Sequence, residues 1–255
     1  MLLIEYCIKL PITIDKYQIA HLYTTMEMSK EYTTGPDVTH RDQSAVQILE
    51  NTPCDHANIP QNKQSTSVTH IQRTLKQYKI PDSLISSIGL IDCVLSESSF
   101  NVFPVMRTTV TAAAGASCEY TIDTLCKPFT DSIVSNMFKL PQLIMDKCVT
   151  IDLDIVNDAL PPGLVREDED PCKVLGMKND WQNSLTPANS MIVYKLMMCH
   201  ANDSISDLVK DTMRNLLIIF HRKLICSQDK WNALTMEDIR TMEAETKKEL
   251  DNIHL

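Results

Sequence analysis

The chain has 255 residues, of which 44% are hydrophobic, so it is long enough to bury one large core. Its formal charge is −9, from 24 basic and 33 acidic residues. This balance argues against a general nucleic-acid binder, which needs a basic face. It also argues against strong overall attraction to anionic membranes, although a local basic patch is still compatible with it.

The cysteines indicate a reducing compartment. There are nine of them, an odd number, and no two have CxxC spacing. Glu5 and Lys9 interrupt the apolar opening MLLIEYCIKL, and no apolar run approaches the ~18–20 residues of a membrane span. We therefore expect a soluble, cytoplasmic protein whose cysteines act as small hydrophobic side chains. Ligand pairs at zinc spacing are missing, so we expect no metal site.

The elements expected from the sequence begin with a strand and a helix. Alternation predicts a half-buried strand over 3–10, with Glu5, Cys7 and Lys9 on the solvent side, and helical spacing follows over 14–29. Further strands are expected at 44–49, 68–75, 91–97, 102–112, 117–127, 150–155 and 190–199. Further helices are expected at 80–88, 131–147, 204–228 and from 235 onward. The polar or irregular segments are 30–43, 50–66 and 157–190.

Two acidic features are expected on the surface. The run EDEDP at 167–171 is typical of a solvated segment. Asp152 and Asp154 are predicted to point outward from the strand at 150–155. Neither feature by itself indicates a site.

The last helix contains a carboxylate that does not fit its pattern. Thr235 and Asp238 predict a capping box at its start. At about 100° per residue, Glu243 falls beside Leu250, at the edge of the apolar face. Helical geometry allows two interpretations: a boundary carboxylate that reaches water, or a polar group directed into a cavity.

The order of the elements predicts the architecture. Strands follow one another in series and do not alternate with helices, so a parallel doubly wound sheet is not expected. We predict an α+β fold in which a large, curved, mostly antiparallel sheet grips long helices. A cavity can lie between such a sheet and its helices. No internal repeat or boundary divides the chain, so we expect one domain, 1–255.

Local motifs give little support for catalysis. The sequence contains no GxSxG, GxGxxG, GxxxxGK[ST] or HExxH. His221 and Cys226 are five positions apart, which on a helix points them roughly 140° apart. The Asp152 and Asp154 pair lies on the face expected to be solvated. We therefore do not expect an enzyme.

Several stretches of the chain are informative when they are taken together and in order. They are LLIEYCIKLPITIDKYQIAHLY at the start, RTTVT after SFNVFP, TIDTLCKP, the EDP at 169–171, VYKL, and FHRKLICSQDKWNALTMEDIRTMEAETKKELDNI at 220–253. This set resembles the phosphatidylinositol transfer proteins. The resemblance covers nearly the whole chain, most closely at its two ends. Its specificity lies in the colinear set and not in any single motif.

The resemblance implies a helix-grip (START-like) fold that encloses one phospholipid, phosphatidylinositol or phosphatidylcholine. It implies no cofactor and no catalytic site. Such a protein moves a lipid monomer between membranes, shielding the acyl chains and holding the headgroup by hydrogen bonds. We accordingly expect a monomer that contacts membrane surfaces transiently and binds no nucleic acid.

The resemblance also implies which residues hold the lipid. The residues at the family's inositol-contacting positions are Thr69, Asn101 and Glu243. Those at its phosphate-contacting positions are Thr108, Thr124, Lys195 and, in place of a glutamine, His21. Lys195 also has support from its own surroundings, since it lies in an apolar strand and a buried ammonium needs a partner such as a phosphate.

Three departures from the family pattern weaken parts of this expectation. The family's inositol-contacting lysine falls at Ile71, or at Gln72 if the segment is one residue longer, and neither is a cation. A membrane-inserting tandem Trp pair falls at Asp203 and Ser204, and a phosphorylatable serine falls at Gly176. Phosphate binding is therefore expected to be mostly intact, inositol recognition partly intact and membrane docking altered.

Three alternatives accompany the favoured hypothesis of a phosphatidylinositol carrier. The same fold could carry phosphatidylcholine, phosphatidic acid or another lipid. It could be a cavity enzyme, for which His21 with Glu243 is the one pair that the sequence offers. It could also be an interaction scaffold with a cavity and no transfer activity.

Overall fold

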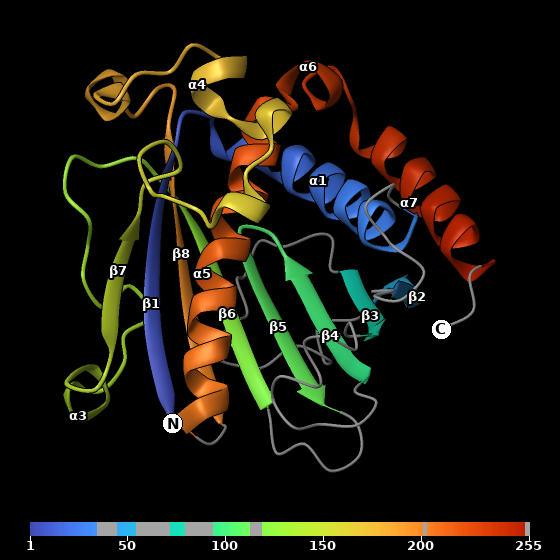
Figure 1. Cartoon of the computed structure of the whole chain (residues 1–255), viewed down its shortest axis with the longest axis horizontal. Helices are drawn as coiled ribbons and strands as arrows, with labels where there is room; N and C mark the ends of the chain where they lie inside the picture. Colours follow the sequence, from blue (N-terminus) through green and yellow to red (C-terminus); the bar gives the residue numbers. More distant parts are fainter. Residues whose placement is uncertain (35–44, 55–71, 80–93, 113–118, 201–202, 253–255) are drawn as a thin grey trace.

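The computed structural model describes residues 1–34, 45–54, 72–79, 94–112, 119–200 and 203–252, without the side chains of 203–205. The strands are β1 (Leu2–Leu10), β2 (Ala45–Pro53), β3 (Gln72–Lys79), β4 (Val94–Val102), β5 (Val105–Ala112), β6 (Glu119–Pro128), β7 (Val149–Leu153) and β8 (Met191–His200) (Figure 1). The helices are α1 (Ile14–Thr34), α3 (Gln142–Met145), α4 (Pro171–Val174), α5 (Asp203–Cys226), α6 (Gln228–Trp231) and α7 (Met236–Asp251). Short 3-10 turns occupy Pro162–Leu164, Glu167–Glu169 and Trp181–Ser184.

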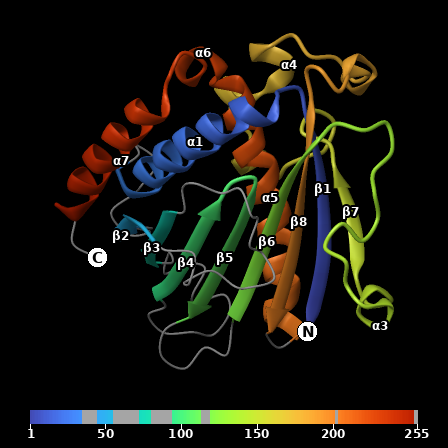
Figure 2. The same cartoon turned by 180° about the vertical axis from the view of Figure 1, so that it is seen from behind.

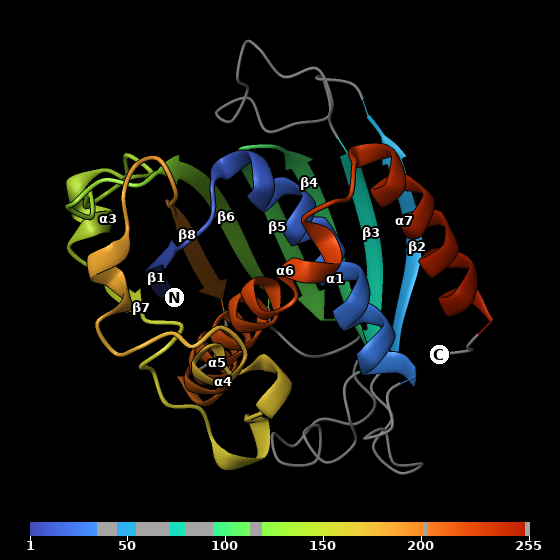
Figure 3. The ribbon, with the colours of Figure 1, turned by 90° about the horizontal axis from the view of Figure 1, so that it is seen from above.

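The strands form one eight-stranded sheet, in the order β2-β3-β4-β5-β6-β8-β1-β7. Every neighbouring pair is antiparallel except β1 and β7, which are parallel. Figure 3 shows the sheet as an arc with α1, α5 and α7 on its concave side. The predicted α+β architecture, a curved and mostly antiparallel sheet gripping long helices, is confirmed.

Three helices cover the concave face. α1 packs against α5, α7, β2 and β6, and α7 packs against α1 and β2 at the far end of the arc. Figure 2 shows the sheet from behind, with α5 beyond it and α1 and α7 near β2 and β3 at one end. Within the described part of the chain, no helix has the length and apolar character needed to cross a bilayer.

The sheet is packed unevenly. The packed strands, β1 and β8, are buried over almost their whole length. The polar strands, β3, β4 and β5, are mostly half-buried, although helices cover the same side of the sheet. β6 lies between the two groups and has both buried and half-buried residues.

The expectation that β1 has a solvent face is wrong. Glu5 and Cys7 are 1% and 2% exposed. The backbone N–H of Met137 donates to Glu5 Oε1 at 3.2 Å, and that of Val134 donates to the Tyr194 hydroxyl at 3.2 Å. The segment after β6 therefore covers the convex face of the packed strands, so Glu5 and Cys7 do not reach water, while Lys9 at the end of β1 is half-buried.

The predicted helix over 131–147 is also wrong, since only the single turn α3 forms. Asn136 and Lys139 have φ angles of 53° and 55°, in the left-handed region that an α-helix cannot include. The Asn136 side chain accepts from the N–H of Leu140 at 2.6 Å and donates to its carbonyl oxygen at 2.9 Å. This local bonding replaces the helical pattern.

The acidic run at 167–171 is not simply solvated. Glu169 is 7% exposed and accepts from Lys223 Nζ at 3.0 Å. Lys223 also bonds Glu31 Oε1 at 2.5 Å, so the run is joined to α5 and α1. Asp170 caps α4 by accepting from the Cys172 N–H at 2.9 Å.

Asp154 is not an outward strand residue either. It follows β7 and accepts from Trp181 Nε1 and Gln182 Nε2, each at 2.9 Å. Desolvation alone would raise the pKa of this carboxyl, but its hydrogen bonds, several from Asn157, outweigh burial and lower the pKa. The negative charge is thus held in place as a structural acceptor.

Some predicted boundaries differ from those observed. β2 continues to Pro53 and β3 occupies 72–79, whereas the sequence predicted strands ending at 49 and 75. A β-bulge interrupts the pairing of β2 between Ile48 and Glu50. The expected helix at 80–88 lies outside the described residues.

Candidate functional site

Three of the predicted lipid-binding residues lie in one line across the sheet. Backbone pairing joins Lys195 to Thr124, Thr124 to Met106, Met106 to Asn101 and Asn101 to Gln72, which we call the cross-strand row. Residues paired across strands share a face of the sheet. Tyr6 pairs with Lys195, and its hydroxyl reaches the Lys210 carbonyl of α5 at 3.5 Å, so the row faces the helices.

Lys195 and Thr124 meet where the packed strands join the rest of the sheet. The ammonium Nζ donates to Thr124 Oγ1 at 3.0 Å, and the two residues are 8% and 3% exposed. Burial lowers the pKa of Lys195 to about 8. No described carboxylate forms an ion pair with this ammonium, so a buried cation is held by a neutral hydroxyl alone.

His21 lies above this pair on α1. Burial, followed by the nearby charge of Lys195, lowers the pKa of His21 well below its ordinary value, so the ring is neutral. Its Nδ1 is buried and has no hydrogen-bond partner among the described residues. Its ring lies 5.1 Å from that of Phe220 and 5.5 Å from that of Tyr17, measured between centroids. The apolar rings position a polar atom that is available to a ligand.

His221 on α5 has a structural role beside it. Its Nδ1 lies 2.7 Å from the Leu217 carbonyl oxygen and must donate to it, so its Nε2 accepts from the Tyr17 hydroxyl at 3.4 Å. Burial lowers the pKa of His221 to about 3. This neutral ring ties α5 to α1.

Thr108 lies one helix-facing position along β5 from the row. Its Oγ1 is 2.9 Å from Ser99 Oγ of β4, and the two residues are paired in register. The structure therefore places Thr108 on the same face as Asn101 and Thr124. Thr69 and Ile71 lie outside the described residues, while Gln72 forms the end of the row and donates to Asn51 Oδ1 at 2.8 Å.

Glu243 lies on α7, whose predicted capping box between Thr235 and Asp238 is confirmed. The Glu243 side chain is 12% exposed and its Oε2 is 2.5 Å from Arg240 Nη1. The carboxylate is therefore covered, and its partner in this structure is a half-exposed guanidinium one turn away. No hydrogen bond joins Glu243 to His21 among the described residues.

The structure adds one candidate that the sequence analysis missed. Lys76 on β3 is 6% exposed and its Nζ lies 3.5 Å from Ser29 Oγ on α1. The predicted strand ended at residue 75, just short of it. The signal that could have found it is the two-residue alternation from Gln72 through Thr74, which places Lys76 on the helix-facing side.

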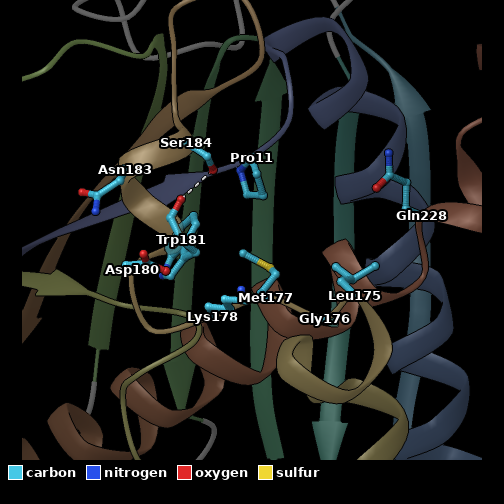
Figure 4. Close-up of a pocket in the computed structure, with 10 residues that line it drawn as sticks. All are labelled: Pro11, Leu175, Gly176, Met177, Lys178, Asp180, Trp181, Asn183, Ser184 and Gln228. Atoms are coloured by element: carbon cyan, nitrogen blue, oxygen red, sulfur yellow. Dashed lines mark hydrogen bonds between the residues drawn. The ribbon is translucent and has the colours of Figure 1, made fainter.

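A surface pocket lies away from this face (Figure 4). It has a volume of 580 Å³, opens to solvent and is lined in part by Pro11, Met177 and Trp181. That size suits a drug-sized molecule and not a two-chain lipid. Gly176 lines it with a φ of 64°, a conformation that favours glycine over serine. The backbone thus explains why glycine occupies this position.

The curved sheet gripping its helices, with Lys195 and Thr124 buried on the gripped face and His21 on α1 near Lys195, defines a helix-grip protein with a polar interior. The chain belongs to the phosphatidylinositol transfer protein family, whose sequence model matches residues 1–248. The resemblance drawn from the sequence is therefore confirmed.

Named relatives of two kinds align with nearly the whole chain. Membrane-associated phosphatidylinositol transfer protein 2 of Mus musculus is 29% identical over 264 residues, covering 97% of this chain but 19% of the relative. Phosphatidylinositol transfer protein 2 of Dictyostelium discoideum is 28% identical over 270 residues, covering 98% of this chain and 95% of the relative. The beta isoform of Homo sapiens is 28% identical over 274 residues, with coverages of 99% and 94%. The chain thus spans about a fifth of the membrane-associated relatives.

Proposed function

We propose that this chain, acting as a single domain and a monomer, encloses one phospholipid between the concave face and the helices and carries it between membranes. The buried Lys195 ammonium with no acidic partner is the observation that carries the proposal, since a lipid phosphate would supply the missing negative charge. Two acyl chains contain about thirty methylenes, each costing about 0.8 kcal/mol in water, so the carrier must shield them in transit.

In this proposal the lipid phosphate contacts Thr108, Thr124, Lys195 and the free Nδ1 of His21. The inositol ring extends along the cross-strand row toward Asn101, with Thr69 and Glu243 as further contacts. These groups offer hydrogen bonds to a phosphate and to hydroxyl groups, so the proposed role is binding without catalysis.

We also propose that the protein works in the cytoplasm and touches membranes only transiently. Its thiols support a reducing compartment: Cys7, Cys126 and Cys226 are buried, and burial raises the pKa of each to about 12. Such thiols stay protonated and unreactive.

The test combines native mass spectrometry of the purified chain with a vesicle-to-vesicle transfer assay. We expect one bound phospholipid per chain and transfer of labelled phosphatidylinositol. A protein that retains no lipid and transfers none would contradict the proposal and favour the scaffold. A protein that carries only phosphatidylcholine would establish the alternative carrier.

Glu243→Ala then tests the inositol side. We expect transfer of phosphatidylinositol to fall about tenfold and transfer of phosphatidylcholine to change little, because a carboxylate accepts from inositol hydroxyls and choline has none. Arg240→Ala is the control, since it removes the partner and leaves the carboxylate. Equal loss of both lipids in Glu243→Ala would show that Glu243 is structural.

A further inference from the structure

Lys76 is a second buried cation on the helix-facing side of the sheet. It is 6% exposed, and the only hydrogen bond given to its ammonium within the described chain is the long contact of 3.5 Å with Ser29 Oγ. A buried ammonium costs several kcal/mol unless it is paired and hydrogen-bonded. Lys76 therefore destabilises the ligand-free protein unless something else compensates it.

The acidic residue paired with Lys76 across the sheet forms no ion pair with it in the described part of the chain. Glu97 of β4 is paired in register with Lys76. Its Oε2 accepts from the Tyr78 hydroxyl at 2.7 Å and its Oε1 from Ser99 Oγ at 2.8 Å. Each oxygen thus accepts from a hydroxyl group, and no ion pair joins Glu97 to Lys76 within the described residues.

Lys76 lies near His21, one of the residues proposed to contact the lipid phosphate. The charges of Lys195 and Lys76 both contribute, after burial, to lowering the pKa of His21. Lys195 of β8 and Lys76 of β3 therefore both lie near His21 of α1. The polar strands around Lys76 are mostly half-buried, whereas the packed strands are buried over almost their whole length.

We propose that Lys76 is a second cationic contact for the lipid headgroup and selects anionic headgroups over choline. This inference rests on the proposed function and specifies its substrate class. Gln72, at the end of the cross-strand row, is a neutral amide. Lys76 lies four residues along the same strand, on the same face, and brings a positive charge to this side of the sheet.

Lys76 favours an inositol headgroup over a choline headgroup in two ways. The ammonium has three N–H donors for the hydroxyls of an inositol or for a phosphate attached to it. A choline group carries a positive charge and accepts no hydrogen bond, so beside Lys76 it meets repulsion and leaves the ammonium unsatisfied. Specificity then comes from an attractive contact for one lipid and a repulsive one for the other.

The experiment compares Lys76→Leu with wild type in transfer from vesicles that contain labelled phosphatidylinositol or labelled phosphatidylcholine. We expect the initial transfer rate of phosphatidylinositol, divided by that of phosphatidylcholine, to fall about tenfold. This is the scale of one charged hydrogen bond. Lys76→Arg should keep the wild-type ratio. The melting temperature of lipid-free Lys76→Leu should rise, because a buried unpaired charge has been removed.

Lys79→Leu is the matched control, since it removes the same charge from the other face of β3. An unchanged ratio in folded Lys76→Leu, or an equal shift in Lys79→Leu, would overturn the inference while transfer itself continued. If Lys76→Leu does not fold, Lys76→Gln is measured by the same criterion. Failure of the proposed function would look different, because wild type would then transfer neither lipid.

Discussion

The packed strands and the polar strands belong to one sheet but are built for different tasks. β1 and β8 are covered on both faces, by the helices and by the segment after β6, and even Glu5 is buried there. β3, β4 and β5 carry threonine, serine, glutamate and lysine toward the helices and stay half-buried. Stability is therefore concentrated at one side of the sheet and ligand chemistry at the other, with Lys195 and Thr124 at the junction.

The largest effect is expected when one apolar side chain is truncated to alanine in the packed strands and one in the polar strands. Ile8→Ala in β1, where the side chain is fully buried, should lower the free energy of unfolding by about 3–4 kcal/mol. Leu75→Ala in β3, where the side chain is half-buried, should cost roughly 1–2 kcal/mol. Urea denaturation of both variants measures the difference. Equal costs would show that the two sides are packed alike.

A change of pH sharpens the comparison at the junction. The pKa of Lys195 is about 8 in the folded protein and 10.5 in its ordinary state. The unfolded chain binds more protons between these values, so the stability of lipid-free protein should rise from pH 8 to 10.5, a gain that is absent below pH 8.

Lipid binding should change in the opposite direction. A phosphate needs the charged ammonium, so affinity for phosphatidylinositol should fall about tenfold, or about 1.4 kcal/mol, between pH 7 and pH 9. Lys195→Met should remove this dependence. If the affinity of Lys195→Met changed with pH as it does in wild type, a group other than Lys195 would be responsible for the pH dependence.

The smallest effect is expected at the cap of α7, the helix that covers β2. Thr235→Ala removes an N-cap and should cost about 1 kcal/mol. Hydrogen exchange should quicken in α7 and stay unchanged in β1. Thr241→Ala, on the exposed side of the same helix, is the control and should change stability little. Faster exchange throughout the sheet would mean that α7 supports the packed strands as well.

Much of the architecture could be predicted because it depends on local patterns. Alternation located most of the strands, and the serial order of strands indicated an antiparallel sheet. The expected helix at 131–147 failed because Asn136 and Lys139 adopt left-handed backbone angles that no spacing of apolar residues reports. The burial of Glu5 could not be predicted either, because it depends on a distant segment crossing the second face of β1.

The candidate site was predictable in its residues but not in its arrangement. Family resemblance identified Lys195, Thr124 and Asn101 as separate positions. Their alignment in one row depends on the bounds and pairing registers of β4, β5, β6 and β8, which no local sequence pattern reports. Lys76 was missed for the same reason, since a strand ending at residue 75 leaves it in a loop.

α1 has a mechanical consequence for any opening of the molecule. It is 21 residues long, about 31 Å, and packs against both β6 and β2. Near its start Tyr17 bonds His221, and near its end Ser29 meets Lys76 and Thr33 accepts from the Val46 N–H at 3.0 Å. Because α1 is bonded near both of its ends, it cannot separate from its neighbours at one end while the contacts at the other end stay intact. Any tilt of α1 disturbs the contacts of Tyr17 and of Lys76 together. Entry of a lipid at one end of the helix is therefore coupled to loosening of the contacts at the other end.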